Sequence, residues 1–303
     1  MKLTKYLYFL FFGITCLLHS SLHAQKDTSR KVSDYDKGFD FYIGAGTYLG
    51  NKFTANYYNG ISNQREVDIG RAIGNKYVKE QIDNLIRDRQ RIILDAEGVR
   101  LREIDENMRY NMAFIFNFAA LYHFNKSVAM YLSFSQARLT ATGGITFDYN
   151  SGVPGNERPQ ILKYHLIGKE LRNFFEIGVY YTFYTEGKVL PFVEFAAQLN
   201  SVRVKDADLF VEDHRFTLMD IYAGKPYVPN SGLTEIEPYL GGVGGGLVGG
   251  FGVRIPFTKS IALEPVVQVQ YIYVNLEVND RKRMMPNYNF MVRLIVGDQI
   301  FAK

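Results

Sequence analysis

The amino-acid sequence predicts an all-β protein: an eight-stranded antiparallel transmembrane up-and-down β-barrel with a helical insertion in its first outer loop. Three observations predict this fold. The N-terminus is typical of an exported chain, long segments alternate between apolar and polar residues, and short connections alternate with long ones. The chain has 23 phenylalanines, 22 tyrosines and 27 glycines but no tryptophan. This composition suits a barrel with an aromatic outer face and a small or polar inner face.

The first two dozen residues have the layout of a secretory signal peptide. Two lysines precede the apolar run 6–18, and the small residue Ala24 stands before Gln25. The run is shorter than the roughly 20 residues that a spanning helix needs, so we expect cleavage near Ala24 rather than a membrane anchor. The predicted division of the chain is a signal peptide at 1–24, a periplasmic N-terminal linker at 25–38 and an outer-membrane β-barrel at 39–303.

Removal of the signal peptide changes the composition in two ways that exclude classes of function. Cys16 is the only cysteine, so the mature chain would have no disulfide, thiol nucleophile or thiolate metal site. The loss of two lysines lowers the formal net charge from +4 to about +2. So small a charge argues against nucleic acid as a partner.

Alternation distinguishes a membrane barrel from a soluble β-sandwich. Within Met108–Phe124 the even positions form a continuous apolar and aromatic stripe, whereas the odd positions include polar residues such as Asn111 and Asn117. This segment is far longer than the usual soluble strand of about five or six residues. The same alternation recurs in segments 175–183 and 288–297. Long two-sided strands of this kind are typical of membrane barrels.

The pattern predicts eight strands in a fixed order. They are residues 39–50, 108–124, 127–147, 161–184, 189–210, 242–257, 260–278 and 286–301. The short joints are 125–126, 185–188 and 258–259, which contain turn-forming or charged residues, and the longer connections are about 51–107, 148–160, 211–241 and 279–285. Such strict alternation is expected when successive hairpin ends face the periplasm and the cell exterior in turn.

Several of these segments resemble a known group of proteins. The block Phe124–Ala129 (FNKSVA), the opening strand Phe41–Gly46 (FYIGAG) and the final Ile300–Lys303 (IFAK) resemble the small outer-membrane barrels of the Bacteroidota. That group includes PorT-like proteins and relatives of the OmpX and OmpA membrane domains. Phe174–Val179 (FFEIGV) is similar to the fourth-strand pattern of PorT-like barrels, with Gly178 where those usually carry proline. The resemblance implies an outer-membrane barrel and, for a PorT-like protein, a part in assembling the type IX secretion machinery.

The interior of the predicted barrel should carry a network of charged side chains. Eight strands leave a lumen that is just wide enough to be filled by side chains. The inward-facing charged residues are Glu176, Glu194, Glu264, Arg293, Arg254 and Arg172. We expect the three glutamates and Arg293 in one layer, because isolated buried charges are costly and need partners. Such a layer would be either a hydrogen-bonded plug or a charge gate for ions or protons.

The outer side of the barrel should be elaborate. The three strands between 127 and 210 exceed the roughly nine to eleven residues that span a bilayer, so their outer halves should project and expose strand edges to a partner. The first outer loop should hold an amphipathic helix over about 76–97. That helix would either pack on the barrel's own rim or bind a partner. The residues expected to bind a partner are Ile82, Leu85, Ile86, Arg87 and Arg91.

Catalysis is the main competing class of function. Of the mature chain's histidines, His214 alone could share a face with a nearby carboxylate, that of Glu212, and no Gly-x-Ser-x-Gly signature occurs. We therefore expect no enzyme, no cofactor and no metal site. The favoured function is a non-enzymatic barrel that binds or scaffolds cell-envelope components through its projecting strands and outer loops. Its expected partners are outer-membrane lipid, lipopolysaccharide and another envelope protein, and the alternatives are a narrow ion channel, a lipid hydrolase or a protease.

Overall fold

A computed structural model describes most of the region in which the barrel was predicted. The described residues are 38–61, 66–151, 153, 159–183, 189–258, 260–276 and 283–297, all within one compact unit, residues 36–303. The predicted signal peptide, and the predicted linker apart from Gly38, lie outside them.

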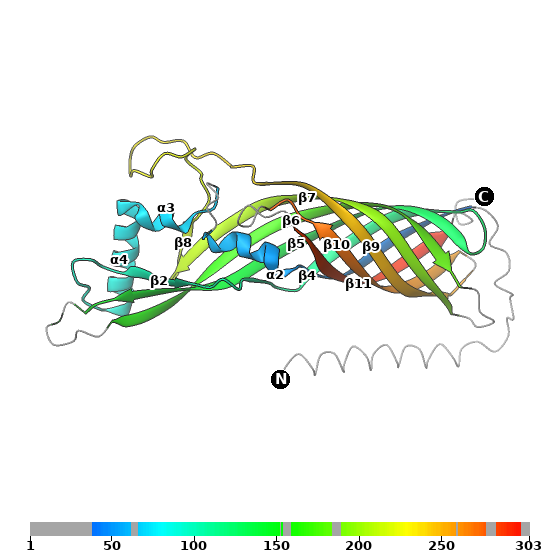
Figure 1. Ribbon diagram of the computed structural model, residues 1–303, viewed down its shortest axis with the longest axis horizontal. Helices are drawn as coiled ribbons and strands as arrows, with labels where there is room; N and C mark the ends of the chain where they lie inside the picture. Colours follow the sequence, from blue (N-terminus) through cyan, green and yellow to red (C-terminus); the bar gives the residue numbers. More distant parts are fainter. Residues whose placement is uncertain are drawn as a thin grey trace. The chain divides into compact units, whose positions relative to one another are not determined.

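Eight strands pair with one another in a closed antiparallel ring (Figure 1). They are β1 (Gly38–Leu49), β4 (Ala113–His123), β5 (Val128–Tyr149), β6 (Gln160–Thr182), β7 (Leu190–Val211), β9 (Gly241–Pro256), β10 (Ile261–Tyr273) and β11 (Met284–Gly297). Each pairs with the next in this order. The last strand returns to the first, with Gly44 opposite Arg293. The predicted up-and-down barrel is confirmed.

One predicted strand is interrupted. The segment predicted at 108–124 begins its ring pairing only at Ala113, because β1 ends at Leu49 and offers no partner beyond that level. Two of the preceding residues form a short strand, β3 (Arg109–Tyr110), which pairs with β5 alone. The interruption shifts the alternation, so Met108, expected on the outer stripe, is fully buried.

The two faces of the ring differ as the alternation predicted. On β4 the side chains of Phe114, Phe116 and Phe118 are 66%, 45% and 47% exposed, whereas Ile115 and Asn117 are buried. We call the exposed apolar side chains around the ring the apolar belt. Its members include Ile43, Phe116, Leu132, Ile177, Phe195, Leu247, Val267 and Phe290, one from each strand. Apolar surface on this scale requires a hydrocarbon environment or a large partner surface.

Three strands continue beyond the ring. β5, β6 and β7 have 22, 23 and 22 residues, which confirms the predicted overlength. Pairing with β4 stops at Ala137 of β5, and pairing with β9 stops at Arg203 of β7. Two short strands join the free parts: β2 (Arg100–Ile104) pairs with β5, and β8 (His214–Thr217) pairs with β7. We call this extension, from β2 through β5, β6 and β7 to β8, the projecting sheet (Figure 1).

The outer halves of the strands between 127 and 210 were predicted to expose their edges, and for the hairpin of β5 and β6 this prediction is wrong. β2 and β3 cover the edge of β5, and β7 covers the other side of β6. Unpaired N–H and C=O groups of an edge readily take strands from the same chain. Within the described residues, the outer edges of the projecting sheet therefore belong to β2 and β8.

The first long loop contains more helix than its sequence pattern predicted. Its helices are α2 (Lys52–Ala55), the 3-10 helix η1 (Asn56–Asn59), α3 (Ile69–Gly74) and α4 (Lys76–Gln90). α4 starts where predicted but ends at Gln90 rather than Glu97, because Arg91 adopts a left-handed conformation with φ 54°. Leu94, predicted as helical, instead forms a β-bridge with Ser151. None of the described helices is both long and apolar enough to cross a membrane.

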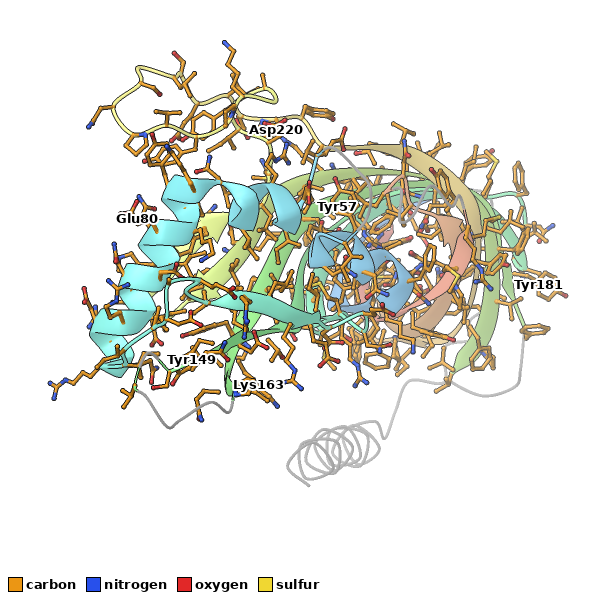
Figure 2. All side chains as sticks on the ribbon, turned by 60° about the vertical axis from the view of Figure 1, so that its left-hand side comes forward. Tyr57, Glu80, Tyr149, Lys163, Tyr181 and Asp220 are labelled. Atoms are coloured by element: carbon orange, nitrogen blue, oxygen red, sulfur yellow. The ribbon has the colours of Figure 1, made fainter. Side chains whose placement is uncertain are left out.

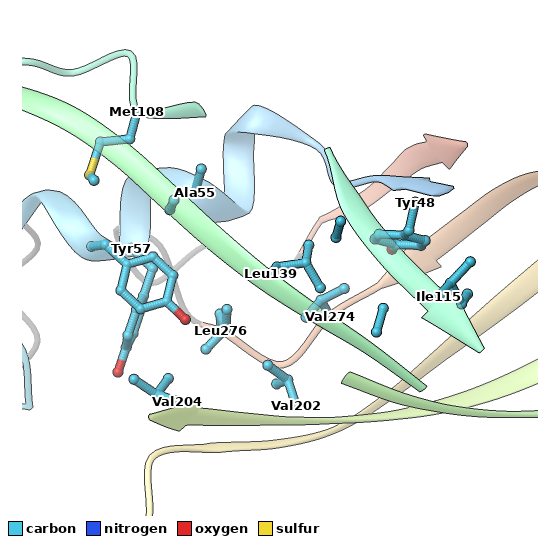
Figure 3. Close-up of a cluster of buried hydrophobic side chains, with 14 of the residues drawn as sticks. Tyr48, Ala55, Tyr57, Met108, Ile115, Leu139, Val202, Val204, Val274 and Leu276 are labelled. Atoms are coloured by element: carbon cyan, nitrogen blue, oxygen red, sulfur yellow. The ribbon is translucent and has the colours of Figure 1, made fainter. Parts of the chain in front are cut away.

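A hydrophobic core lies where the ring passes into the projecting sheet (Figure 3). The helices α2 and η1 contribute Ala55, Tyr57 and Tyr58 to it, each no more than 2% exposed. The labelled members in Figure 3 are Tyr48, Ala55, Tyr57, Met108, Ile115, Leu139, Val202, Val204, Val274 and Leu276. The first long loop therefore folds back over the mouth of the ring instead of standing free of it.

Candidate functional site: the charged lumen and the groove beside α4

The middle of the lumen holds a buried ion pair. The guanidinium of Arg293 donates two hydrogen bonds to the carboxylate of Glu194, Nη1–Oε2 at 2.7 Å and Nη2–Oε1 at 2.9 Å. Gln268 donates a third to the same carboxylate at 2.6 Å. Both ionised side chains are at most 1% exposed. Paired donors of this kind compensate much of the cost of burying the two charges.

Glu176 lies beside this pair but is held by neutral groups. It accepts hydrogen bonds from Ser133 Oγ at 3.2 Å and from Gln198 Nε2 at 2.7 Å. Its side chain is 2% exposed. The layer at this level therefore contains two carboxyl groups and one guanidinium.

A second charged cluster fills the end of the ring at which the short turns lie. Arg254 donates to Glu264 at 2.5 Å and to Asp40 at 3.3 Å, and the hydroxyl of Tyr180 donates to Glu264 at 2.6 Å. Asp40 also contacts the ring of His123, with 2.9 Å between Oδ2 and Nε2. Glu264 was expected in one layer with Arg293, and the two residues do lie opposite each other on neighbouring strands. They do not bond to each other, because the Glu264 carboxylate accepts from Arg254 and the long Arg293 side chain reaches across the lumen to β7.

A third cluster closes the other end of the ring. Arg172 pairs with Glu170 at 2.5 Å and donates to the hydroxyl groups of Tyr48 at 3.2 Å and Tyr110 at 3.0 Å. Arg172 and Glu170 are both fully buried. The predicted charge network thus consists of three layers stacked along the lumen, and each contains an arginine with at least one carboxylate partner.

The α2–η1 segment, residues 52–59, is bonded to this third cluster, and we call it the plug. Thr54 Oγ1 accepts from Arg172 at 3.1 Å, and the hydroxyl of Tyr58 donates to Glu170 at 2.5 Å. The aromatic ring of Tyr58 lies directly on Gly168 of β6, where an added Cβ would come within 2.1 Å of the ring. A glycine at this position therefore allows the plug to seat in the mouth.

Gly168→Val should unseat the plug. The new side chain would overlap the Tyr58 ring, and overpacking of this kind costs about 1–3 kcal/mol. We expect amide hydrogen exchange in residues 52–59 to accelerate by roughly tenfold, with little change in the ring strands. Gly144→Val, on the neighbouring strand, is the matched control because an added Cβ there meets nothing within 4 Å. Equal protection of the plug in the two variants would contradict this account of Gly168.

Glycines of β9 also make room for inward-facing side chains. An added Cβ at Gly250 would lie 2.5 Å from the Glu194 carboxyl oxygen, and one at Gly252 would lie 2.5 Å from the Phe192 ring. The glutamate of the central ion pair can therefore lie against its neighbouring strand only because that strand carries glycine.

Outside the ring, α4 lies across the projecting sheet and borders two cavities (Figure 2). Their volumes are about 510 Å³ and 580 Å³. Both are lined by Gln81 of α4 and by Arg215 and Phe216 of β8. The first extends to α3 and to the loop that carries Asp220, and the second extends to His214. We call the two cavities together the α4 groove.

Ion pairs hold the walls of the α4 groove. Arg71 of α3 binds Asp220 at 2.7 Å, which ties the loop to the helix. Arg215 binds Asp208 at 2.9 Å and Asp206 at 3.0 Å. Burial raises the pKa of the Asp208 carboxyl, although the neighbouring Arg215 opposes this shift. The groove therefore combines aromatic and aliphatic surface with charged groups, as is common in binding sites.

The structure places the five predicted partner-binding residues of α4 in different environments. Ile82 and Ile86 are 1% and 0% exposed and pack against the protein itself, so they are not available to a partner and that assignment is corrected. Leu85 is half-buried and lines the second cavity. Arg87 and Arg91 are exposed. Packing of the helix on the barrel's own extension buries its apolar face.

The carboxylate–histidine pair considered for catalysis does not form. Glu212 has φ 53° in a tight turn and accepts from Tyr164 and Gln90, so it faces away from His214. His214 Nδ1 instead lies 2.9 Å from Asp213 on the surface, and this contact lowers the pKa of the Asp213 carboxyl. In the part of the chain that the structure describes, no three His, Cys, Asp or Glu side chains are grouped as a metal ion would require.

Comparisons with known proteins show likeness only to solved structures. No family model matches the sequence, and no curated protein matches it. The Neisserial surface protein A structure has 11% identity and a TM-score of 0.41, over 86% of this chain and 96% of that one. Ail of Yersinia pestis, in complex with the heparin analogue sucrose octasulfate, has 9% identity and a TM-score of 0.34, over 86% of this chain and 97% of that one. OprG from Pseudomonas aeruginosa has 10% identity and a TM-score of 0.33, over 88% of this chain and 97% of that one. Likenesses at this level identify no function for this chain, and its own strand pairing establishes the barrel.

Proposed function

We propose that the chain is a closed, non-enzymatic barrel of the bacterial outer membrane, and that its projecting sheet binds or scaffolds other cell-envelope components outside the cell. The observation that carries this proposal is the sheet itself, which leaves the ring above the apolar belt and bears the α4 groove. A chain that needed only to span the bilayer would need strands of about nine to eleven residues.

The orientation follows from the connections. The strands β4, β6 and β9 all finish at one end of the ring, and the plug, α4 and the projecting sheet lie at the other. In outer-membrane barrels, short turns face the periplasm and long loops face the exterior. The projecting sheet would then stand in the space outside the outer leaflet.

The lumen supports a binding role over conduction. Three charged layers cross the ring, and Arg172 and Arg293 are completely buried in two of them. The plug covers the mouth above the third layer. A narrow channel, the alternative function, would require several of these contacts to open together.

The α4 groove is the surface that we assign to the partner. Gln81, Arg215 and Phe216 lie where its two cavities meet. A photo-crosslinking residue at Gln81 should form covalent adducts with a cell-envelope partner in intact cells, and Phe216→Asp in the same protein should reduce their yield by roughly tenfold. Glu80, the exposed preceding residue of α4, lines neither cavity and is the control position. Equal adduct yields at Gln81 and Glu80 would reject the groove as the binding surface.

A role as an accessory of the type IX secretion machinery, suggested by the resemblance to PorT-like barrels, is a narrower form of this proposal. The identity of the protein crosslinked at Gln81 decides it. Secretion-machinery components would support that form, whereas other envelope proteins would leave the general binding role and exclude the narrower one.

A further inference from the structure

Basic side chains gather on one part of the projecting sheet. In the register of three adjacent strands, Arg138 of β5 lies opposite Leu171 of β6, which lies opposite Arg203 of β7. Lys169 is two residues further out on β6, and Lys205 is the extra residue where the pairing of β6 with β7 shifts. Four cations therefore occupy a small area that three strands share. We call Arg138, Lys169, Arg203 and Lys205 the basic cluster.

The basic cluster points away from the interior. Arg138, Lys169 and Lys205 are exposed and Arg203 is half-exposed. The residues that alternate with them, Leu139, Glu170 and Val204, are buried. Because side chains alternate across a strand, the basic cluster lies on the same outer face as the apolar belt below it.

The outer face changes in chemistry row by row toward the ring. Below the row of Arg138 and Arg203 comes a row of amide and hydroxyl groups. Its members are Gln136, Asn173 and Ser201, and the next row is Phe134, Phe175 and Leu199. Two residues along a strand rise about 6.6 Å, and a tilt of about 40° reduces the height. The basic row thus lies roughly 10 Å above the first apolar row, within side-chain reach of a headgroup layer.

The charges in this area do not cancel. Lys169 contacts Asp206 at 3.2 Å, and Arg203 contacts Glu237 at 2.8 Å. Asp206 is shared with Arg215, and the side chain of Glu237 is 76% exposed. No salt bridge within the described residues involves the other two cations, Arg138 and Lys205. Exposed pairs of this kind contribute little stability, so an arriving anion can replace Glu237 on Arg203.

We propose that the basic cluster binds the phosphorylated headgroup of lipid A, the membrane anchor of lipopolysaccharide, in the outer leaflet. This inference rests on the proposed position of the barrel in the outer membrane. The two arginines stand two strand spacings apart, roughly 10 Å, which is wider than one phosphate and suits a phosphate carried on a sugar. Guanidinium groups favour phosphate oxygens, and the row of amide and hydroxyl groups below would meet the sugar and its acyl linkages.

The test measures lipid retained by the full-length protein in mild detergent by native mass spectrometry. The probes are bisphosphorylated lipid A, the same lipid after phosphate removal, and phosphatidylglycerol. The double variant Arg138→Gln/Arg203→Gln should retain at least tenfold less bisphosphorylated lipid A than the wild type. The matched control, Arg89→Gln/Arg102→Gln, removes two exposed arginines, one from α4 and one from β2, and should retain as much as the wild type. Lys205→Gln, which changes a single exposed residue, should retain roughly threefold less bisphosphorylated lipid A than the wild type. It provides the test if the double variant fails to fold.

The other outcomes reject the inference in distinguishable ways. Unchanged retention by Arg138→Gln/Arg203→Gln and by Lys205→Gln, or equal retention of dephosphorylated lipid A, would overturn it. Equal competition by phosphatidylglycerol would show a general anionic-surface contact instead of a lipid A site. Membrane fractionation separates this inference from the proposed function, because a wild-type protein found outside the outer membrane would overturn both. If the protein lies in the outer membrane but its lipid A retention does not change when the basic cluster is substituted, only the lipid site is overturned.

Discussion

Arg293→Ala is expected to lower the free energy of unfolding by about 3–5 kcal/mol, because it leaves a buried carboxylate without its partner. Glu194 would keep Gln268 as a donor but lose both bonds from the guanidinium. No part of the Glu194 side chain can reach solvent in compensation, since it is 1% exposed. Urea unfolding of the protein in lipid vesicles measures the change.

Two further variants separate the lost charge from the lost volume. Arg293→Met/Glu194→Met removes both charges and keeps the lumen filled, so its stability should approach that of the wild type. Arg87→Ala, which removes an exposed arginine from α4, should change stability by less than about 0.5 kcal/mol. If Arg293→Ala lowers the free energy of unfolding no more than Arg87→Ala does, the ion pair of Arg293 with Glu194 is not shielded from water.

Ile177→Arg should also be strongly destabilising, although the side chain is 55% exposed. In a barrel embedded in lipid, arginine near the bilayer midplane costs about 2–4 kcal/mol. Ile161 is the matched control, since it lies on the outer face of the same strand and is 50% exposed, but belongs to the projecting sheet. Ile161→Arg should cost less than about 0.5 kcal/mol.

The comparison of these two isoleucines can be made by equilibrium unfolding in vesicles and by the yield of folded protein in membranes. In a soluble barrel both substitutions would place arginine in water, and both would be nearly neutral. Equal stability of the two variants would therefore show that the ring is not embedded in a membrane.

The ring was predictable from sequence because its strands carry a local signal. Phe114, Phe116 and Phe118 alternate with inward residues over a length that soluble strands seldom reach, and the structure confirms both the strand and its faces. The start of α4 was predictable for a similar reason, since apolar residues recur at helical spacing from Val78. Periodicity of this kind reports the environment of each face directly.

Elements that depend on distant partners were not predictable. The plug consists of two single turns of helix held by Arg172 and Glu170, more than a hundred residues away in sequence. β2 and β8 have four or five residues and form because longer strands offer them an edge. The end of α4 at Arg91 depends on a backbone conformation for which glycine or asparagine would have been the sequence signal.

The lumen partners show the same limit on a smaller scale. Strand parity points the side chain of Glu264 inward, but its bond to Arg254 rather than Arg293 depends on the stagger between strands and on the reach of each side chain. The pair of Asp40 with His123 was not predictable, because the two strands are neighbours in the ring but far apart in sequence. The available sequence signal was that an acid and a histidine both face inward near the same end of the predicted ring.

If the barrel lies in the outer membrane, lipid surrounds the apolar belt. Cys16, in the predicted signal peptide, is the only cysteine of the chain, so single cysteines can carry spin labels without interference. Labels at Ile177, Phe195 and Val267 of the protein in vesicles should relax with oxygen, which partitions into lipid, and should be insensitive to a water-soluble nickel complex. A label at Ile161 should show the opposite preference. Strong relaxation of all four labels by the nickel complex would show that water, and not lipid, surrounds the apolar belt.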